Sequence, residues 1–170
     1  MVKVSRKRVP KARAVHLLVE EPRWREEAVV LRLVRRAVRL TLAACLEGNG
    51  QSVTILLSNN AKLRALNRHF RNKDKPTNVL SFESADDPAS LGDIALGFGT
   101  VASEARAQRK SLAEHAAHLA MHGALHLLGY DHEKSSDAER METLETELLA
   151  RLGIADPYAP RPYTKRRKAS

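Results

Sequence analysis

The residues best suited to chemistry lie between His122 and His132, in the run His-Gly-Ala-Leu-His-Leu-Leu-Gly-Tyr-Asp-His. His122 and His126 are four residues apart, so on a helix both imidazoles leave the same face. Gly129 lets that helix end and the chain turn back, which brings His132 round as a third nitrogen ligand. Three neutral imidazoles can hold a zinc ion and leave its fourth position open for water, as in catalytic sites. We therefore predict one zinc ion per chain at the end of a helix in the C-terminal half, although three histidines also accept other divalent metals.

The same spacing is typical of the metzincin peptidases, which carry Glu directly after the first histidine as the base that activates water. This chain has Gly123 at that position. Peptide hydrolysis by that mechanism therefore lacks its base, whereas the ability of a metal to acidify water remains. The alternative is that these are core or surface histidines on a helix that ends in glycine.

Two more histidines extend the stripe towards the N-terminus, at His115 and His118. Four ligands along one straight helix would spread over roughly 16 Å, so only the three that bracket Gly129 are predicted to share an ion. His118 is interpreted as a residue behind the ligands or a substrate contact, and His115 as a core or surface residue. Asp131 and Glu133 flank the last ligand and could orient an imidazole or act as the base.

The length and composition predict one domain with a real core, with basic segments at both ends. We place a basic N-terminal arm at residues 1–13, a domain at 14–157 and a basic tail at 158–170. The single Cys45 suits a reducing compartment. No signal peptide and no apolar run of membrane-spanning length are visible, so we expect a cytoplasmic protein without a membrane partner.

The net charge of +9 is unevenly distributed along the chain. Residues 1–13 hold six Lys/Arg and residues 161–170 hold five, with no acidic residue in either segment. Residues 22–75 hold 12 basic and 4 acidic side chains, while residues 76–160 hold 6 and 14. A basic side and basic arms suit a polyanion such as nucleic acid, although solvated basic ends are equally compatible with the tails.

The order of elements predicts an α/β (α+β) fold with a mixed four-stranded sheet and about five helices. Strands are expected at 14–21 and 51–57, joined by a helix over 23–46, which favours a parallel pair. Ser58 is a candidate N-cap for a helix over 59–70. Strands at 77–83 and 91–98 read as a hairpin. The remaining helices are expected at 101–110, 111–128 with Ser111 as N-cap, and 136–152.

Three segments in order resemble the YbeY family of bacterial endoribonucleases over roughly residues 14–152. They are the His122–His132 motif, the run from Leu66 to Phe82 (Leu-Asn-Arg-His-Phe-Arg-Asn-Lys-Asp-Lys-Pro-Thr-Asn-Val-Leu-Ser-Phe), and Gly92-Asp93-Ile94. The resemblance implies a zinc held by His122, His126 and His132 and cleavage of single-stranded RNA. It further implies work on ribosomal RNA, especially the 3′ end of the small-subunit RNA, and in ribosome quality control, with the small subunit and its assembly proteins as partners.

The resemblance also places the functional arginine of the family on Arg71. A guanidinium there could bind two phosphate oxygens and stabilise the charge that builds up on an attacked phosphodiester. Lys73 and Lys75 are predicted as weaker phosphate contacts. The chain departs from the family pattern at Glu83, where Pro is usual, so the loop into the hairpin is expected to differ.

The principal hypothesis is thus a zinc-dependent endoribonuclease with Arg71, His122, His126 and His132 as catalytic residues. A non-catalytic ribosome-assembly factor with a structural zinc, or a metallopeptidase, are the alternatives. Aromatic residues are few, with one Trp, three Phe and three Tyr. We therefore expect phosphate contacts, rather than base stacking, to dominate RNA binding.

Overall fold

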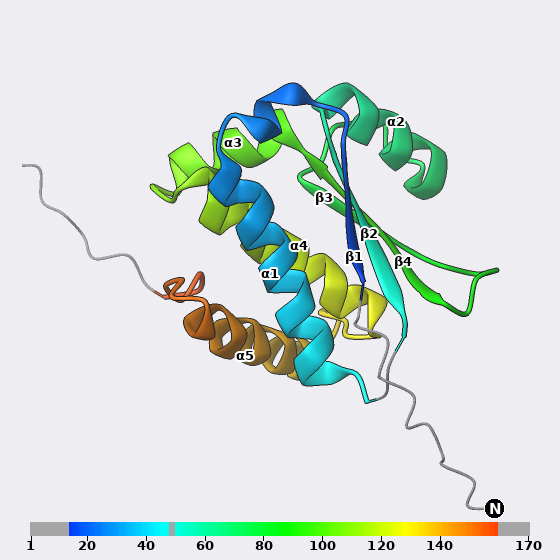
Figure 1. Cartoon of the computed structure of the whole chain (residues 1–170), viewed down its shortest axis with the longest axis vertical. Helices are drawn as coiled ribbons and strands as arrows, with labels where there is room; N and C mark the ends of the chain where they lie inside the picture. The colour runs from blue at the N-terminus through cyan, green and yellow to red at the C-terminus, as the bar shows by residue number, and fades with distance from the viewer. Residues whose placement is uncertain (1–13, 48–49, 160–170) are drawn as a thin grey trace, which may run out of the picture.

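A computed structural model describes residues 14–47 and 50–159 of the chain. The predicted basic arm at 1–13 and all but the first two residues of the predicted tail at 158–170 therefore lie outside the described residues. The described part is a single α/β domain built on a mixed four-stranded sheet, as predicted (Figure 1). Within it, no helix is both long and apolar enough to cross a bilayer. In chain order the elements are β1 (Val15–Val19), a 3₁₀ turn (Pro22–Arg25), α1 (Ala28–Cys45), β2 (Ser52–Ser58), α2 (Asn60–Arg71), β3 (Val79–Glu83), β4 (Ser90–Gly97), α3 (Phe98–Ala107), α4 (Leu112–Leu127) and α5 (Ser135–Arg151).

The strand order is β1-β2-β4-β3, which makes β1 and β3 the edges of the sheet. The pairs β1–β2 and β2–β4 are parallel, and β3 pairs antiparallel with β4 as the predicted hairpin. The helix between β1 and β2 provides the crossover that parallel neighbours require. The edge strand β3 contacts α4, and the hydroxyl of its Ser81 donates to the carbonyl of Gly123 on that helix.

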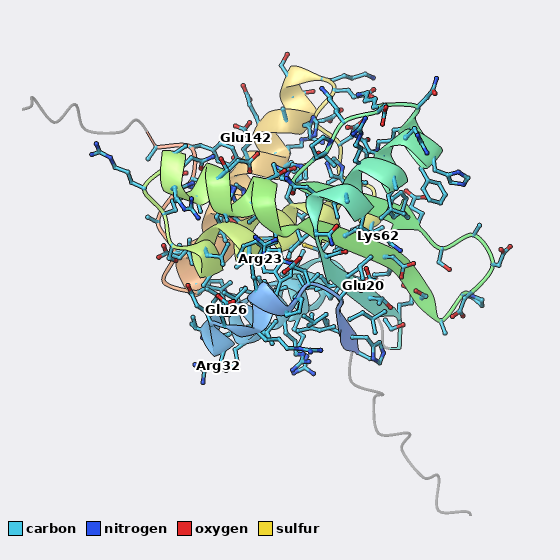
Figure 2. The ribbon with its side chains drawn as sticks, turned by 90° about the horizontal axis from the view of Figure 1, so that it is seen from above. Glu20, Arg23, Glu26, Arg32, Lys62 and Glu142 are labelled. Carbon is cyan, nitrogen blue, oxygen red and sulfur yellow. The ribbon has the colours of Figure 1, made fainter. Side chains whose placement is uncertain are left out.

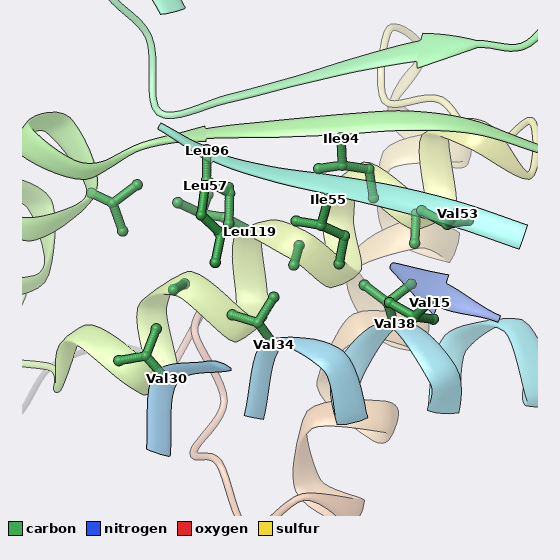
Figure 3. Close-up of a cluster of buried hydrophobic side chains, with 14 of the residues drawn as sticks. Val15, Val30, Val34, Val38, Val53, Ile55, Leu57, Ile94, Leu96 and Leu119 are labelled. Carbon is green, nitrogen blue, oxygen red and sulfur yellow. The ribbon is translucent and has the colours of Figure 1, made fainter. Parts of the chain in front are cut away.

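Alternation along the strands divides the core between the two faces of the sheet. Ile94 and Leu96 of β4 enter the large cluster formed with α1 and α4, shown in Figure 3, whereas Ala95 faces α2. On that second face, Leu63 of α2 packs with Leu80 and Ala95. The sheet is therefore covered by α1 and α4 on one side and by α2 on the other.

The N-terminal half of α1 departs from the predicted helix, which had been expected from residue 23. Pro22 begins a short 3₁₀ turn, and α1 itself begins only at Ala28. The turn buries Trp24 completely, with its indole N–H donating to the carbonyl of Ser58 at 2.9 Å. Satisfying that donor in the core fixes the chain in the turn before the helix can start.

The helix α1 buries one face against the sheet and α4. Val38 and Leu42 are buried, while Ala44 is exposed. The arginine side chains of this helix are exposed, and Figure 2 shows Arg32 at its outer side. The N-cap of α2 is Asn59, whose side chain accepts from the Lys62 N–H, and Ser58 is the last residue of β2. The prediction of Ser58 as the cap was therefore wrong by one residue.

Candidate metal centre and active-site cavity

The helix α4 begins at the predicted cap and carries the first two ligand candidates. The Ser111 hydroxyl accepts from the Glu114 N–H while the Glu114 carboxylate accepts from the Ser111 N–H, which is a capping box. The apolar residues of α4 then bury most of its surface, so that His122 and His126, one turn apart, are held on a rigid element. Such support fixes ligand positions more closely than a loop would.

The end of α4 orients the second imidazole. Gly129 adopts a φ of 89°, its N–H donates to the carbonyl of His126, and the Tyr130 N–H donates to that of Leu125. This pair of bonds is the Schellman motif, which glycine in the left-handed region permits. The carbonyl of Tyr130 is thereby placed 2.9 Å from His126 Nδ1. Since a carbonyl can only accept, that nitrogen carries the hydrogen and Nε2 is left with its lone pair.

A buried carboxylate orients the first imidazole in the same way. Glu145 of α5 is completely buried, and its Oε1 accepts from His122 Nδ1 at 2.6 Å. Burial alone would raise the pKa of this carboxyl, but hydrogen bonds from His118, His122 and Tyr158 outweigh it and lower the pKa to about 2. An ionised Glu145 holds the hydrogen of His122 on Nδ1, so its Nε2 also presents a lone pair.

The chemistry of these donors fits a cation. Nε2 of His122 and Nε2 of His126 lie 3.0 Å apart, each as an acceptor facing an acceptor. Each of the two rings and the ring of His132 offers one ligand nitrogen, and these three nitrogens lie within 4.8 Å of one another. Burial, together with the nearby His122, lowers the pKa of His126 and favours the neutral ring that a metal needs. A divalent ion would satisfy the two facing lone pairs, which otherwise repel, and could take a nitrogen of His132 as a third ligand.

Two of the three histidines, His126 and His132, line an open cavity of about 470 Å³. Its lining includes His126 and His132, and one cationic side chain, Arg71 from the end of α2. The acidic side chains in the lining are those of Glu83, Asp131 and Glu133. A substrate in this cavity would thus meet the metal ligands and a guanidinium together.

The space beside Gly123 explains why no side chain stands there. A Cβ at this position would lie 2.9 Å from Ser81 Oγ and 3.0 Å from Ile94 Cγ2. The Ser81 hydroxyl also donates to the Gly123 carbonyl at 3.1 Å, which ties the edge strand β3 to α4. A glutamate base directly after the first ligand, as in the metzincins, therefore has no room in this fold.

A sequence model of the family described as Endoribonuclease YbeY matches residues 20–153. The chain belongs to the YbeY family. Among curated relatives named endoribonuclease YbeY, the one from Chelativorans sp. is 50% identical over 143 residues, 80% of this chain and 87% of the relative. The one from Bradyrhizobium diazoefficiens is 42% identical over 165 residues, covering 91% and 90% of the two chains. The solution structure of TM1509 from Thermotoga maritima has a TM-score of 0.55 at 22% identity over 89% of this chain and 99% of its own, which supports the fold alone.

The structure brings only some of the residues predicted for a YbeY site together. Arg71, His126 and His132 line the cavity, and His122 lies beside the other two histidines. Lys73 and Lys75 are exposed on the loop after α2 but do not line it. His118 does not line it either: its ring is largely buried, with Nε2 3.4 Å from Glu145 Oε2, so it lies behind the ligands rather than at the cavity.

Other candidates took roles that the sequence left open. His115 is a core residue whose Nε2 lies 2.7 Å from a carboxylate oxygen of Glu104 on α3. Asp131 accepts from the backbone N–H of His132 at 2.6 Å, so it braces the third ligand through the main chain. Glu133 lines the cavity beside His132.

Sequence reasoning missed Glu145 and Tyr158. The Tyr158 hydroxyl donates to Glu145 Oε2, and the Tyr158 ring packs edge-on against His118 at 5.8 Å between centroids. Tyr158 is the first residue of the predicted basic tail, yet it contacts the centre of the domain. A signal for Glu145 was present, because it falls on the buried stripe of α5 with Met141, Leu148 and Leu149. A carboxylate at such a position needs a buried partner.

Proposed function

We propose that this protein is a zinc-dependent endoribonuclease that cuts single-stranded RNA. The observation that carries the proposal is that the Nε2 atoms of His122 and His126 face each other at 3.0 Å with His132 beside them. These histidines adjoin a cavity that Arg71 also lines. The relatives named endoribonuclease YbeY support RNA as the substrate. The open cavity supports an enzyme over an assembly factor with a structural zinc.

Each residue of the site has a distinct task in this proposal. His122, His126 and His132 hold the ion, with Glu145 and the Tyr130 carbonyl fixing the first two rings. Zinc, when bound, supplies Lewis acidity and lowers the pKa of a water ligand to about 7. Arg71 forms no ion pair with any described residue, so its fork is available for two phosphate oxygens of a phosphodiester. It stabilises the charge that develops as phosphorus is attacked.

The biological substrate that we propose is ribosomal RNA, with the 3′ end of the small-subunit RNA as the principal cleavage region. Ribosome quality control is a second task of the same activity. The small subunit and its assembly proteins are the proposed partners, and the cytoplasm, where bacterial ribosomes mature, is the proposed location. Lys73 and Lys75 would contact phosphates outside the cavity, because both are exposed on the loop that follows Arg71.

The test is cleavage of a labelled single-stranded RNA by protein freed of other nucleases, with chelation followed by zinc restoration. His126→Ala is the variant, and His16→Ala, an exposed histidine on the opposite edge strand, is its control. We expect cleavage that is lost on chelation, restored by zinc, absent in His126→Ala and intact in His16→Ala. RNA left intact by zinc-loaded protein would favour the assembly factor, and cleavage of an unstructured peptide would favour a peptidase.

Arg71 is tested separately from the metal. Arg71→Ala is expected to lower kcat by about 10²-fold or more while leaving zinc affinity unchanged, because the guanidinium acts on the transition state. Arg71→Lys keeps the charge but loses the bidentate fork, so it should recover only part of the rate. Arg36→Ala, an exposed arginine of α1, is the matched control. An unchanged kcat in Arg71→Ala would remove Arg71 from the mechanism.

A further inference from the structure

An exposed aromatic pair stands at the end of α2. The ring of Phe70 is unusually open for a phenylalanine, with 59% of its surface exposed. It contacts the partly buried Phe82 of β3, with 4.7 Å between ring centroids and 51° between planes, and His69 meets it edge-on at 4.6 Å. The third phenylalanine, Phe98, packs against buried Trp24 at 5.0 Å. Two of the three phenylalanines in the chain therefore share one surface site.

This pair adjoins the active-site cavity through the backbone of both its members. Arg71 directly follows Phe70 and Glu83 directly follows Phe82, and both of these neighbours line the cavity. Alternation along β3 turns Ser81 towards α4 and Phe82 towards α2. Because β3 is an edge strand, the aromatic pair and the cavity lie on the two sides of one exposed strand.

The surface around the pair is strongly basic. Residues 60–77 carry six Lys/Arg and one acidic residue, Asp74, which is engaged by Arg64 through two hydrogen bonds of 2.8 and 3.0 Å. Arg71, Lys73 and Lys75 form no ion pair within the described part of the chain. An exposed aromatic face among free cations is complementary to a nucleic-acid strand, whose phosphates are anionic and whose bases are flat and apolar.

We infer that Phe70, backed by Phe82, is a stacking platform for one base of a single-stranded RNA, next to the nucleotide whose phosphate lies at Arg71. The inference rests on the proposed function, because it supplies the subsite of that same RNA. Phe82 holds the Phe70 ring in place, so little rotamer freedom is lost when a base stacks on it. The adjoining cations hold the flanking phosphates.

The platform also supplies a physical reason for single-strand specificity. Bases in a duplex are stacked on one another and paired, so no free face is available to a protein side chain. An unpaired nucleotide can turn its base onto Phe70 as the strand passes over the edge of the sheet at β3. Every base has a π face, so the platform selects strandedness rather than sequence.

The experiment combines variants of Phe70 with RNA that lacks single bases. A labelled single-stranded 12-mer is prepared with one abasic nucleotide at each position in turn. Phe70→Leu keeps apolar bulk but removes the π face, Phe70→Tyr keeps the face, and Leu18→Ala is the control. Leu18 is 56% exposed and lies on the opposite edge strand. The kcat/KM of zinc-loaded protein is measured for each RNA, together with binding of the same RNAs in chelator by fluorescence anisotropy.

We expect Phe70→Leu to weaken binding of intact RNA about tenfold, within the roughly 5- to 150-fold range of one stacked base. At one position of the RNA, an abasic nucleotide should weaken binding by about the same factor in wild type, Phe70→Tyr and Leu18→Ala. The same abasic RNA should bind Phe70→Leu no more weakly than the intact RNA does. The slope of log affinity against log salt should stay the same in Phe70→Leu, since no phosphate contact is lost.

Two results would overturn the platform. One is an abasic nucleotide that weakens binding as much in Phe70→Leu as in wild type, and the other is a Phe70→Leu protein that binds intact RNA as tightly as wild type. A fall in the salt slope would do the same, because it would mean that the substitution acts on the neighbouring cations. Failure of the proposed function is distinguishable, since wild-type protein would then cut no RNA in the presence of zinc. The binding measurements in chelator still decide the platform in that case.

Discussion

Glu145→Gln is expected to weaken zinc binding while leaving the fold intact. The carboxylate of Glu145 is buried and receives hydrogen bonds from three side chains, of which His122 Nδ1 at 2.6 Å belongs to a ligand. Glutamine has nearly the same shape, and its amide oxygen can still accept from one of them. What it removes is the negative charge that makes the His122 ring a better donor to a cation.

The carboxylate of Glu145 is ionised, because hydrogen bonds from His118, His122 and Tyr158 outweigh its burial and lower its pKa from 4.5 to about 2. The variant therefore replaces a negative charge behind the His122 ring with a neutral amide. Removing a carboxylate behind a histidine ligand typically weakens metal binding 10- to 100-fold. Because glutamine keeps one acceptor for His122, we expect a loss of about tenfold, or about 1.4 kcal/mol.

The assay is competition for zinc with a chromophoric chelator at fixed pH, with thermal unfolding as the check on folding. Glu147→Gln, an exposed carboxylate on the same helix, is the matched control and should bind zinc as wild type does. Tyr158→Phe removes one of the three donors without touching the ligand, so it should weaken zinc binding by less than Glu145→Gln. Wild-type zinc affinity in a folded Glu145→Gln protein would refute the reasoning.

Three further outcomes follow from other parts of the structure. Gly92→Ala should destabilise the protein by at least about 2 kcal/mol, because the φ of Gly92 is 142° and a Cβ would lie 2.0 Å from the Phe82 carbonyl oxygen. Gly129→Ala, with open space around it, should cost only about 1 kcal/mol. Similar urea midpoints for the two variants would contradict this. Burial lowers the pKa of His115 from 6.5 despite the Glu104 carboxylate beside it. The contribution of neutral, buried His115 to folding stability is therefore complete above pH 6.5 and is lost as the pH falls below that value. Urea midpoints at pH 7.5 and 5.5 should differ more in wild type than in His115→Gln. Zinc at 100 times its Kd should raise the free energy of unfolding by about 2.7 kcal/mol and the Tm by about 5–10 °C. An equal rise in Tm for His126→Ala would mean that the ion binds elsewhere.

The elements that hold the site were predictable where local chemistry decides them. Ser111 and Glu114 mark the start of α4, and Gly129 marks its end, because capping depends on residues within one turn of each other. The β3–β4 hairpin and the parallel β1–β2 pair followed from alternation and from the helix-length connection between β1 and β2. The grouping of His122, His126 and His132 required no more than helix geometry and one turn.

The parts that escaped prediction depend on distant packing. Glu145 lies 23 residues beyond His122, and only the contact between α4 and α5 brings the two side chains to 2.6 Å. Phe70 and Phe82 meet because α2 covers one face of β3, which the spacing of two aromatic residues does not reveal. The start of α1 moved because Trp24 found a buried hydrogen-bond acceptor on β2. In each case a tertiary contact overrode or added to a local pattern.

The charges of the cavity link metal loading to substrate binding. Arg71 is the single cation among the lining residues, and it faces the carboxylates of Glu83, Asp131 and Glu133. Without a metal this set repels a phosphodiester at close range, and a divalent ion at the histidines offsets two of the three negative charges. Since the ion and the phosphate then attract each other across the same small space, each must tighten the binding of the other by the same factor. The other basic side chains of α2 and its following loop lie outside this balance, so they can retain RNA whether or not the metal is bound. The cavity itself becomes attractive to a phosphate only when the three histidines are loaded.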